Sequence, residues 1–598
     1  MNHCGSFFIQ KYISERKRKM KEQISKVIGE VLGLSNAENT IVIETPPDSK
    51  MGDIAIPCFG FAKVLHKNPA LIAAQLQETL EQKKDLLGID KVIATGGYCN
   101  LFVNRALFAE NTLSKANTDN LGVQKIGTGK TVCMDYSSPN IAKNFHVGHL
   151  RTTVIGNSLY KIHEKLGYNV VRINHLGDWG TQFGKLIVAY KNWSSKEAVE
   201  KNGIQELLDI YVKFNKEKEE HPALMDEARA WFVKMEQGDE EALSIWEWFK
   251  DISMVEFERV YNMLGISFDS YTGESFYRKK VPALVELLKD KHLLIESQGA
   301  NVIDLSEYDM PPCMITKKDG SSIYHSRDIA AVLYRKEKYN FDKCLYVTGL
   351  EQSLHFKQVF KAIELMGLDY YENLVHVPYG LVSLDGEKLS TRTGNIIYAE
   401  DILKEAVKRA LELIEEKNPS LKNKEEVAKQ VGIGAVIFHD LFNQRIKNIN
   451  FSWKDVLSFE GTTGPYVQYT YARAGSILRK YEKESATSSE TLFAADTLFT
   501  NTDINYQALT EDASFALIKT IGGYEKAVTT AAESYEPSVV ARYLISLCTD
   551  FNKFYQECPI LKEENESIKT ARLQLVNVAQ QIIKDATALL GMECPEEM

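Results

Sequence analysis

Apolar and polar positions in the N-terminal part of the chain predict an α/β module. From Met20 onward, a helix is indicated by apolar residues at helical spacing: Ile24, Val27, Ile28, Val31 and Leu32. Further elements are predicted in this order: a strand (41–43), a helix after the Asn68-Pro69 break (70–80), two strands around the Gly96-Gly97 turn (91–94 and 101–103), and a polar linker (114–129).

The middle of the chain has the pattern of a parallel sheet. The apolar run 131–136 predicts a strand that ends in a polar turn, a helix is predicted from about 148 to 166, and 170–173 predicts a second strand. Strand, helix and strand in this order form a βαβ unit, whose strands are parallel. The apolar runs 344–347 and 375–382 are candidates for further strands of this sheet.

Helical periodicity dominates the rest of the chain, both in a charged insertion over about 185–265 and from about residue 400 to the end. With 598 residues the chain is too long for one hydrophobic core, so several domains are expected. We predict four segments: 1–19, a leader or an incorrectly assigned start; 20–118, the N-terminal module; 128–405, the parallel-sheet domain with its insertion; and 406–598, an all-helical domain.

The composition narrows the class of protein only a little. It is ordinary for a globular protein, with 44% hydrophobic and 25% charged residues. The net charge of −10 argues against a protein that coats nucleic acid non-specifically, although a local basic groove stays possible. Nine cysteines, an odd number without a CxxC pair, indicate free thiols in a reducing compartment and no structural zinc. We therefore expect a cytoplasmic protein.

Membrane insertion is not predicted, because no apolar run reaches the roughly 18 to 20 residues that span a bilayer. Residues 1–19 are basic and lack the apolar stretch of a secretory signal. They are either a short targeting leader or a sequence upstream of a true start at Met20. The second interpretation is favoured, because the amphipathic pattern begins at Met20.

The strongest candidate site is the HVGH string, which lies where the first strand of the parallel sheet meets a helix. Ligands bind at the carboxyl ends of such strands, and a helix start favours anions. His146 and His149 share one face and could donate hydrogen bonds to a phosphate, and Gly148 would let a nucleotide approach the backbone. Alternatives are ordinary N-cap histidines or a metal-binding pair. The metal site is disfavoured, because no further ligand stands at suitable spacing.

A second candidate element is the polar, glycine-flanked string DGEKLSTRTGN at 385–395. Lys388 and Arg392 in a mobile loop would suit a triphosphate, whose charge must be neutralised during displacement. Alone, the string is better interpreted as a solvated loop. Its pairing with HVGH upstream favours the nucleotide-binding role.

HVGH with a downstream KLSTR resembles the HIGH and KMSKS motifs of class I aminoacyl-tRNA synthetases. The strings SSPNIAKNFHVGHLR, NHLGDWGTQFG, YHSRD and GTTGPYVQYTYAR are similar to those of the arginyl-tRNA synthetases, and the likeness extends from about residue 20 to the C-terminal tail. It implies an α/β fold: a Rossmann-type catalytic domain, an N-terminal module that contacts the tRNA elbow, and a helical anticodon-binding domain.

The resemblance implies an ATP-dependent ligase of protein biosynthesis. Arginine would react with ATP to give arginyl adenylate, and would then be attached first to the 2′-hydroxyl of the terminal adenosine of tRNA(Arg). By this likeness the ATP-binding residues are His146, Gly148, His149, Lys388 and Arg392, and the catalytic ones are His146, His149 and Lys388. Mg²⁺ would share the phosphate charge without a set of protein ligands. A monomer is the family's usual state.

By the same likeness the arginine-binding residues are Asp135, Asn140, Glu274, Tyr324, Asp328 and Gln352. Glu274 and Asp328 would face the guanidinium, which carboxylates bind with fixed orientation. Tyr324 would bond its edge, and Asn140 and Gln352 would hold the α-amino and carboxylate end. Alternatives are a surface ion pair of Asp328 with Arg327, and a solvated loop position for Glu274.

For tRNA, the GTTGPYVQYTYAR string offers Tyr466, Gln468, Tyr469 and Arg473. The aromatic faces could stack on unpaired bases and Arg473 could take a phosphate, although tyrosines at this spacing also line helical cores. In the N-terminal module, Asn100 and Phe102 are the candidates for the elbow contact.

One departure from the family pattern concerns the KLSTR loop, where Thr391 stands in place of the second lysine and Arg392 is a candidate substitute. Three other functions are alternatives: a class I synthetase for a different amino acid, a non-catalytic RNA-binding paralogue, and a smaller HxGH nucleotidyltransferase. The charge of the expected pocket argues against the first, the intact motifs against the second, and the long helical C-terminal part against the third.

Overall fold

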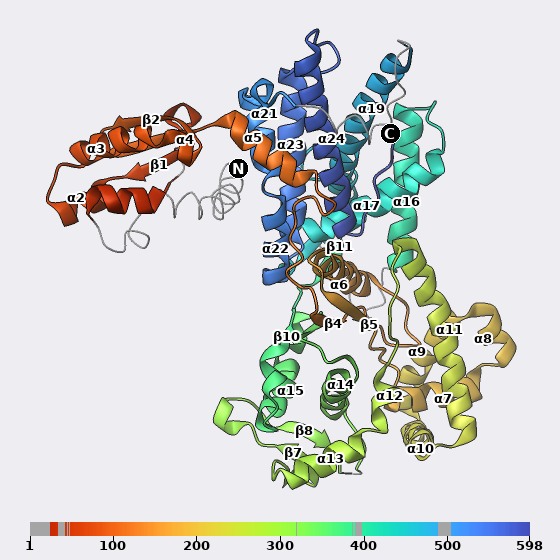
Figure 1. Cartoon of the computed structure of the whole chain (residues 1–598). Coiled ribbons are helices and arrows are strands. Elements are labelled where there is room, and N and C mark those ends of the chain that lie inside the picture. Colours follow the sequence, from red (N-terminus) through yellow and green to blue (C-terminus); the bar gives the residue numbers. More distant parts are fainter. Residues whose placement is uncertain are drawn as a thin grey trace. The chain divides into compact units, whose positions relative to one another are not determined.

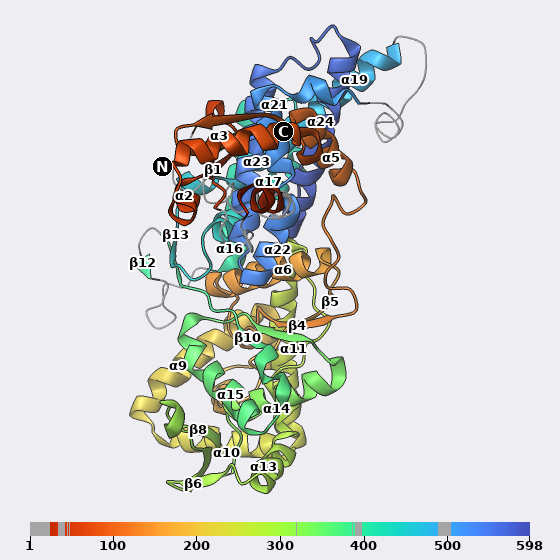
Figure 2. The same cartoon turned by 60° about the vertical axis from the view of Figure 1, so that its left-hand side comes forward.

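The computed structural model describes residues 24–33, 42–44, 46, 48–318, 320–384, 387–388, 398–487 and 504–598. The chain separates into two compact units (Figures 1 and 2). The first comprises the residues up to Val123 with Thr470–Ala527 and Arg542–Asp585, and the second comprises Gln124–Tyr469, Val528–Ala541 and Ala586–Met598.

The N-terminal part of the first unit is an antiparallel sheet in the order β1-β3-β2, formed by Ile54–Pro57, Tyr98–Val103 and Ile89–Thr95 respectively. Its helices are 24–32, α2 (Phe59–Leu65), α3 (Pro69–Gln82) and α4 (Lys84–Leu87). Asn68 caps α3 by accepting a hydrogen bond from the backbone N of Ala70 at 2.9 Å. Pro69 suits the first helical position, because a backbone N–H there would have no partner within the helix and proline has none.

The predicted strand over 41–43 is wrong for its described part, since 42 and 43 carry no strand and only Glu44 pairs, as an isolated bridge with Ala55. Residue 41 lies outside the described residues. The predicted linker is also partly helical, because α5 covers Arg105–Ala116. Arg105 at its start pairs with Asp512 at 2.8 Å, which joins α5 to α21 (Asp512–Ile521).

The second unit contains the predicted parallel sheet, in the order β10-β9-β4-β5. Figure 1 labels β10, β4 and β5 of this sheet. Its strands are β4 (Thr131–Asp135), β5 (Asn169–Ile173), β9 (Lys343–Tyr346) and β10 (Leu374–His376), all parallel. α6 (Val147–Lys165) connects β4 to β5, which confirms the βαβ unit. α14 (Tyr324–Tyr339) and α15 (Ser353–Leu365) contribute to the apolar core beside the sheet.

The close packing of α6 on β4 depends on a glycine. A Cβ added to Gly156 would lie 2.2 Å from Cγ of Tyr136, whose ring is fully buried at the end of β4. Gly156 therefore lets α6 pack closely against the end of β4.

The helical insertion is present and consists of α7 (Thr181–Trp193), α8 (Lys196–Asn202), α9 (Ile204–Glu220), α10 (Ala223–Gln237) and α11 (Glu240–Leu264). After α12 (Glu274–Arg278) and α13 (Val281–Asp290) comes an antiparallel sheet that the sequence pattern did not predict: β6 (Ile295–Ser297), β7 (Ala300–Ile303) and β8 (Cys313–Thr316). These strands are too short to show a periodicity.

The apolar run 375–382 is divided between two sheets. β10 ends at His376, and the chain continues into β11 (Val382–Leu384), which pairs with β12 (Glu387–Lys388) and β13 (Ile449–Phe451). The remaining helices of the C-terminal part are α16 (Ala399–Lys417), α17 (Lys424–Phe442), α18 (Trp453–Val456), α19 (Gly464–Thr487), α22 (Tyr524–Ser534), α23 (Ser538–Glu557) and α24 (Glu566–Leu589). Among the described residues, none of the helices has the length and apolar character needed to span a bilayer.

Candidate active site

The HVGH turn is the N-terminal cap of α6, and it fixes the protonated nitrogen of both histidines. The backbone N of Gly148 donates to Nδ1 of His146 at 3.1 Å, and the backbone N of His146 donates to Nδ1 of His149 at 3.3 Å. A neutral imidazole that accepts at Nδ1 carries its proton on Nε2. Each ring therefore presents an Nε2–H as a donor, and the two rings stack with their centroids 3.8 Å apart.

Both rings are held in the neutral form. Burial, and then the charge of Lys143, lower the pKa of His146 to about 4. Burial, with the charges of His146 and Lys143, lowers the pKa of His149 well below its usual value. Neutral donors at a helix start, where backbone N–H groups also point outward, suit a phosphate oxygen.

A contact within the turn explains the glycine at position 148 more directly than the close approach of a nucleotide does. A Cβ at this position would lie 2.9 Å from Cε1 of His146, closer than atoms normally approach. The glycine therefore lets the imidazole of His146 fold over the first turn and accept the N–H of Gly148.

Arg151, two residues after the motif, connects α6 to the segments that precede β11 and β13. Its buried guanidinium donates to the carbonyl oxygens of Leu381 at 3.0 Å, Arg445 at 3.0 Å and Lys447 at 2.9 Å, and lies 3.6 Å from Asp440. Leu381 precedes β11, whose Ser383 pairs with Lys388 in β12. Only the backbone of Lys388 is described, and Thr391 and Arg392 lie outside the described residues.

Two of the candidate arginine-binding residues are joined by the loop of the NHLGDWG string. On one side, the backbone N of Gly177 donates to the carbonyl of Pro139 at 3.0 Å, and a Cβ at Gly177 would lie 2.0 Å from Oδ1 of Asn140. On the other side, the backbone N of Glu274 donates to the carbonyl of Leu176 at 3.0 Å. The loop therefore brings Asn140 and Glu274, distant in sequence, to the same region.

Glu274 is 9% exposed and pairs with Arg327 at 3.0 Å. Burial raises the pKa of Glu274 to about 8, although the charge of Arg327 acts in the opposite direction. Arg327 thus pairs with Glu274 and not with its neighbour Asp328. The alternatives of a solvated Glu274 and of an Arg327–Asp328 surface pair do not fit this geometry.

Asp328 lies one turn into α14 and is bonded to His355 of α15, whose Nε2 lies 2.6 Å from Oδ2. Burial favours its neutral form, but the hydrogen bond and charge of His355, together with the charges of His175 and Arg335, lower the pKa of Asp328 to about 2. Tyr324, at the start of α14, is 60% exposed. Gln352 is exposed at the end of the 3₁₀ turn η4 (Leu350–Gln352), directly before α15.

Asp135 ends β4 and lies in the interior rather than at the surface. Its Oδ2 pairs with Arg335 at 2.7 Å, and its Oδ1 accepts a hydrogen bond from Ser138 at 2.8 Å. Arg335, His175 and His355 are site residues that the sequence did not suggest, because single charged positions on helices and loops are usually solvated. For His175, its place in the NHLGDWG string, which carries the family resemblance, is the one sequence feature that points to the site.

The side chains of the candidate tRNA-binding residues differ in their exposure to solvent. Tyr469 of α19 is 40% exposed, whereas Gln468 is fully buried and its Nε2 donates to the carbonyls of Gln430 at 2.9 Å and Glu593 at 2.7 Å. Gln468 therefore fastens the C-terminal tail and offers no surface to RNA. Tyr466 is partly buried, and the guanidinium of Arg473 bonds Asn552 and lies 5.5 Å from the ring of Tyr555.

In the N-terminal module, Asn100 and Phe102 lie on β3 and point to the face opposite the core residues Cys99, Leu101 and Val103. Asn100 is nevertheless 9% exposed, while Phe102 is partly exposed with the ammonium of Lys91 5.7 Å from its ring. Of the two, Phe102 offers the more accessible surface.

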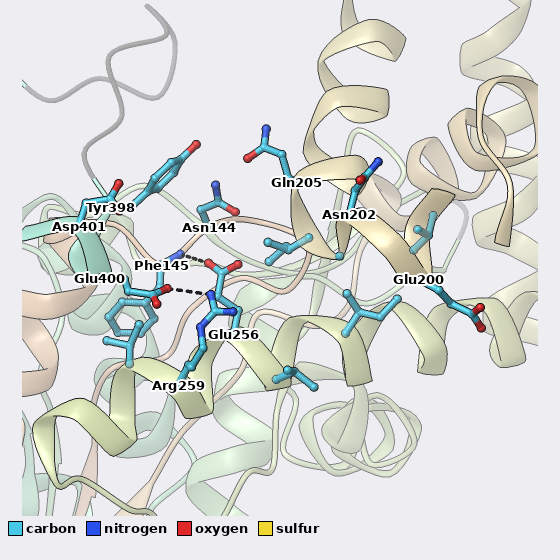
Figure 3. Close-up of a pocket in the computed structure, with 16 residues that line it drawn as sticks. Asn144, Phe145, Glu200, Asn202, Gln205, Glu256, Arg259, Tyr398, Glu400 and Asp401 are labelled. Atoms are coloured by element: carbon cyan, nitrogen blue, oxygen red, sulfur yellow. Dashed lines mark hydrogen bonds and ion pairs between the residues drawn. The ribbon is translucent and has the colours of Figure 1, made fainter. Parts of the chain in front are cut away.

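A cavity of about 510 Å³ opens beside the approach to the HVGH turn (Figure 3). Asn144 and Phe145 form one wall, α11 provides Glu256 and Arg259, and Tyr398 and Glu400 stand at the start of α16. Glu256 accepts the backbone N–H of Phe145 at 3.3 Å, and Arg259 pairs with Glu400 at 2.7 Å. These contacts hold the segment that leads into the turn.

Comparisons with known proteins agree along nearly the whole chain, from residue 18 onward. Three family models match: "tRNA synthetases class I (R), catalytic domain" over 111–453, "DALR anticodon binding domain" over 467–598, and "Arginyl tRNA synthetase N terminal domain" over 18–103. The chain is 48% identical to an arginine–tRNA ligase of Alkaliphilus metalliredigens, over 97% of this chain and 99% of the relative. It is 50% identical to that of Clostridioides difficile, over 94% and 97% respectively.

Solved structures show the same fold. The arginyl-tRNA synthetase of Thermus thermophilus superposes with a TM-score of 0.75 at 24% identity, over 97% of this chain and 100% of the other. That of Plasmodium falciparum gives a TM-score of 0.75 at 24% identity, over 97% and 99%.

Proposed function

The chain belongs to the arginyl-tRNA synthetases of class I, and from this premise we propose which of its residues carry out the reaction. The enzyme uses ATP to join arginine to tRNA, through an arginyl adenylate as is general for the class. We propose that the first acceptor is the 2′-hydroxyl of the terminal adenosine.

The observation that carries the proposed mechanism is the pair of fixed Nε2–H donors at the start of α6. A carboxylate oxygen of arginine attacks the α-phosphorus of ATP, the bond to the β-phosphate oxygen breaks, and pyrophosphate leaves. His146 and His149 donate to phosphate oxygens as their charge increases, and no protein nucleophile is needed. Lys388, and Arg392 in place of a second lysine, would neutralise the pyrophosphate.

Mg²⁺ fits this scheme as a companion of ATP. It is usually held by substrate phosphates and water with one or two carboxylates. Among the described residues, no group of three histidine, cysteine or carboxylate side chains could hold a metal ion by itself. Bound with ATP, the positive charge of the ion would offset the negative charge of the triphosphate.

For arginine, we propose that the guanidinium lies between Glu274 and Asp328, with Tyr324 at its edge. Asn140 and Gln352 would hold the α-amino and carboxylate end. The support is the placement of Asn140 and Glu274 by one loop, and the burial of Glu274, where a cation would meet little competition from water. Asp135 contributes indirectly, through Arg335.

We further propose the domain roles that the sequence indicated: 20–118 for the tRNA elbow, 128–405 for catalysis and 406–598 for the anticodon. Tyr466, Tyr469 and Arg473, with Asn100 and Phe102 in the N-terminal module, are the proposed tRNA contacts. Gln468 is left out because it is buried. A cytoplasmic monomer is the proposed working form.

Exchange of pyrophosphate into ATP tests the assignment. We expect exchange with arginine that requires tRNA, a property that the family resemblance implies, and none with lysine, glutamate or cysteine. Exchange that is supported by another amino acid in preference to arginine would overturn the substrate assignment.

A further inference from the structure

The carboxylate of Asp328 lies between two imidazole rings that come from different elements. On one side, Nε2 of His355 in α15 lies 2.6 Å from Oδ2. On the other, Nε2 of His175, in the loop after β5, lies 3.6 Å from Oδ1, which is too far for a hydrogen bond. The two oxygens of this carboxylate therefore differ in their hydrogen bonding to the two rings. Oδ2 accepts a hydrogen bond from His355, whereas Oδ1 accepts none from His175.

The orientation of His175 is set from the sheet. Its Nδ1 lies 3.3 Å from Nη2 of Arg335, which can only donate, so Nδ1 accepts and the proton is on Nε2. Arg335 is fixed in turn by Asp135 at the end of β4, at 2.7 Å. This series of contacts anchors the imidazole that faces Oδ1.

His355 is supported from its other face. Its ring lies 4.5 Å from the ring of His325, measured between centroids. His325 lies with Nε2 3.0 Å from Oε1 of Gln358, and Nε2 of Gln358 donates to the carbonyl of Pro311 at 2.8 Å. Gln358 therefore fixes the ring of His325. Because the ring of His325 packs against that of His355, it limits the movement of the His355 ring in this direction.

We propose that His355 is a positioning residue for arginine recognition: its Nε2–H holds Oδ2 of Asp328 and leaves Oδ1 to face the substrate guanidinium. A carboxylate that can rotate loses orientation before each encounter, whereas a bonded one is preorganised. Glu274, the other proposed guanidinium partner, is held by Arg327 at 3.0 Å. The inference rests on the proposed function, since it takes arginine as the occupant of this site.

The test compares two substitutions of His355 in the full-length enzyme. H355L removes the donor, while H355Q places an amide N–H where Nε2 was. We expect H355L to raise KM for arginine roughly ten- to a hundredfold, as for loss of a charge-assisted hydrogen bond, and to change KM for ATP less than about twofold. H355Q should recover most of the arginine affinity. H292Q, at an exposed histidine, is the matched control.

The outcomes separate the two proposals. If H355L and H355Q raise KM for arginine equally, or if both substrates are affected alike, the positioning role is wrong. If D328N also leaves KM for arginine unchanged, the proposed arginine site itself is wrong. Should H355L fail to fold, as judged by circular dichroism, H355N is the second variant, since its shorter amide cannot reach Oδ2 and should reproduce the loss.

Discussion

The imidazole rings of His146 and His149 stack with centroids 3.8 Å apart and planes inclined by 23°. Each accepts a backbone N–H at Nδ1, so the two outward nitrogens are both donors. The helix cap thereby selects the tautomer of each ring. Burial adds to this by lowering both pKa values and keeping the rings neutral.

The first prediction concerns these donors. H149A should lower kcat for pyrophosphate exchange about 10²- to 10³-fold, as for loss of one donor to a transition-state oxygen. H149Q keeps an N–H near the position of Nε2 and should lose less. H146A and H146Q should follow the same order. If alanine and glutamine are equally harmful at both positions, the histidines act by capping α6 and not by donating to phosphate.

A second prediction uses Glu274, whose pKa is raised to about 8 by burial. At pH 7 the free enzyme holds this carboxyl mostly protonated. A bound guanidinium favours the ionised form, so arginine binding should release a proton, and its affinity should rise with pH until about 8 and then level off. Titration calorimetry in buffers of different ionisation enthalpy measures the proton directly.

The substitution E274Q should abolish this proton release and the associated rise in affinity with pH. The exposed pair-forming residue Glu286 gives the matched control, E286Q, which should behave as the unaltered enzyme. Proton release that persists in E274Q would assign the ionisation to another group.

The sequence predicted the longer elements, because a long apolar pattern distinguishes a helix from a strand and a short one does not. The βαβ unit around α6 was recognisable because an apolar strand, a polar turn and a long helix follow directly in sequence. The sheet β6-β7-β8 was not, since its strands have only three or four residues and Ile295–Ser297 is exposed throughout. The run 375–382 misled because apolar composition does not show where the chain leaves one sheet for another.

The residues of the candidate site likewise fall into those that the sequence could predict and those that it could not. HVGH could be found because its residues are neighbours in the chain. The partners that fix the proposed arginine-binding carboxylates could not, because Arg335 lies 200 residues from Asp135, and Asp328 meets His355 across 27 residues. Only the packing of α14 and α15 on the sheet brings these pairs together, and no local pattern encodes that packing.

A third prediction tests the contact of α6 with β4. Alanine in a helix is ordinarily more stable than glycine by about 1 kcal/mol. In G156A, however, the new Cβ would meet the buried ring of Tyr136 at 2.2 Å, and overpacking of this kind costs about 1–3 kcal/mol. We expect a lower midpoint of urea unfolding. G60A is the control, because nothing lies within 4 Å of its Cβ. An equal response of both variants would contradict the packing argument.

The last prediction concerns Arg151. R151M removes the donors to three carbonyl groups that lie beside the hairpin of Lys388, and it leaves Asp440 without its cation. Burial already raises the pKa of Asp440 to about 6, against the effect of Arg151. Removing one partner of a buried ion pair costs about 3–5 kcal/mol, so the midpoint of urea unfolding should fall markedly. R151K should restore little, because an ammonium cannot reach three carbonyls as a guanidinium fork does. In the double variant R151M/D440N the uncompensated charge is absent, so its midpoint should lie above that of R151M. If the double variant is instead as unstable as R151M, the carbonyl contacts alone account for the role of Arg151.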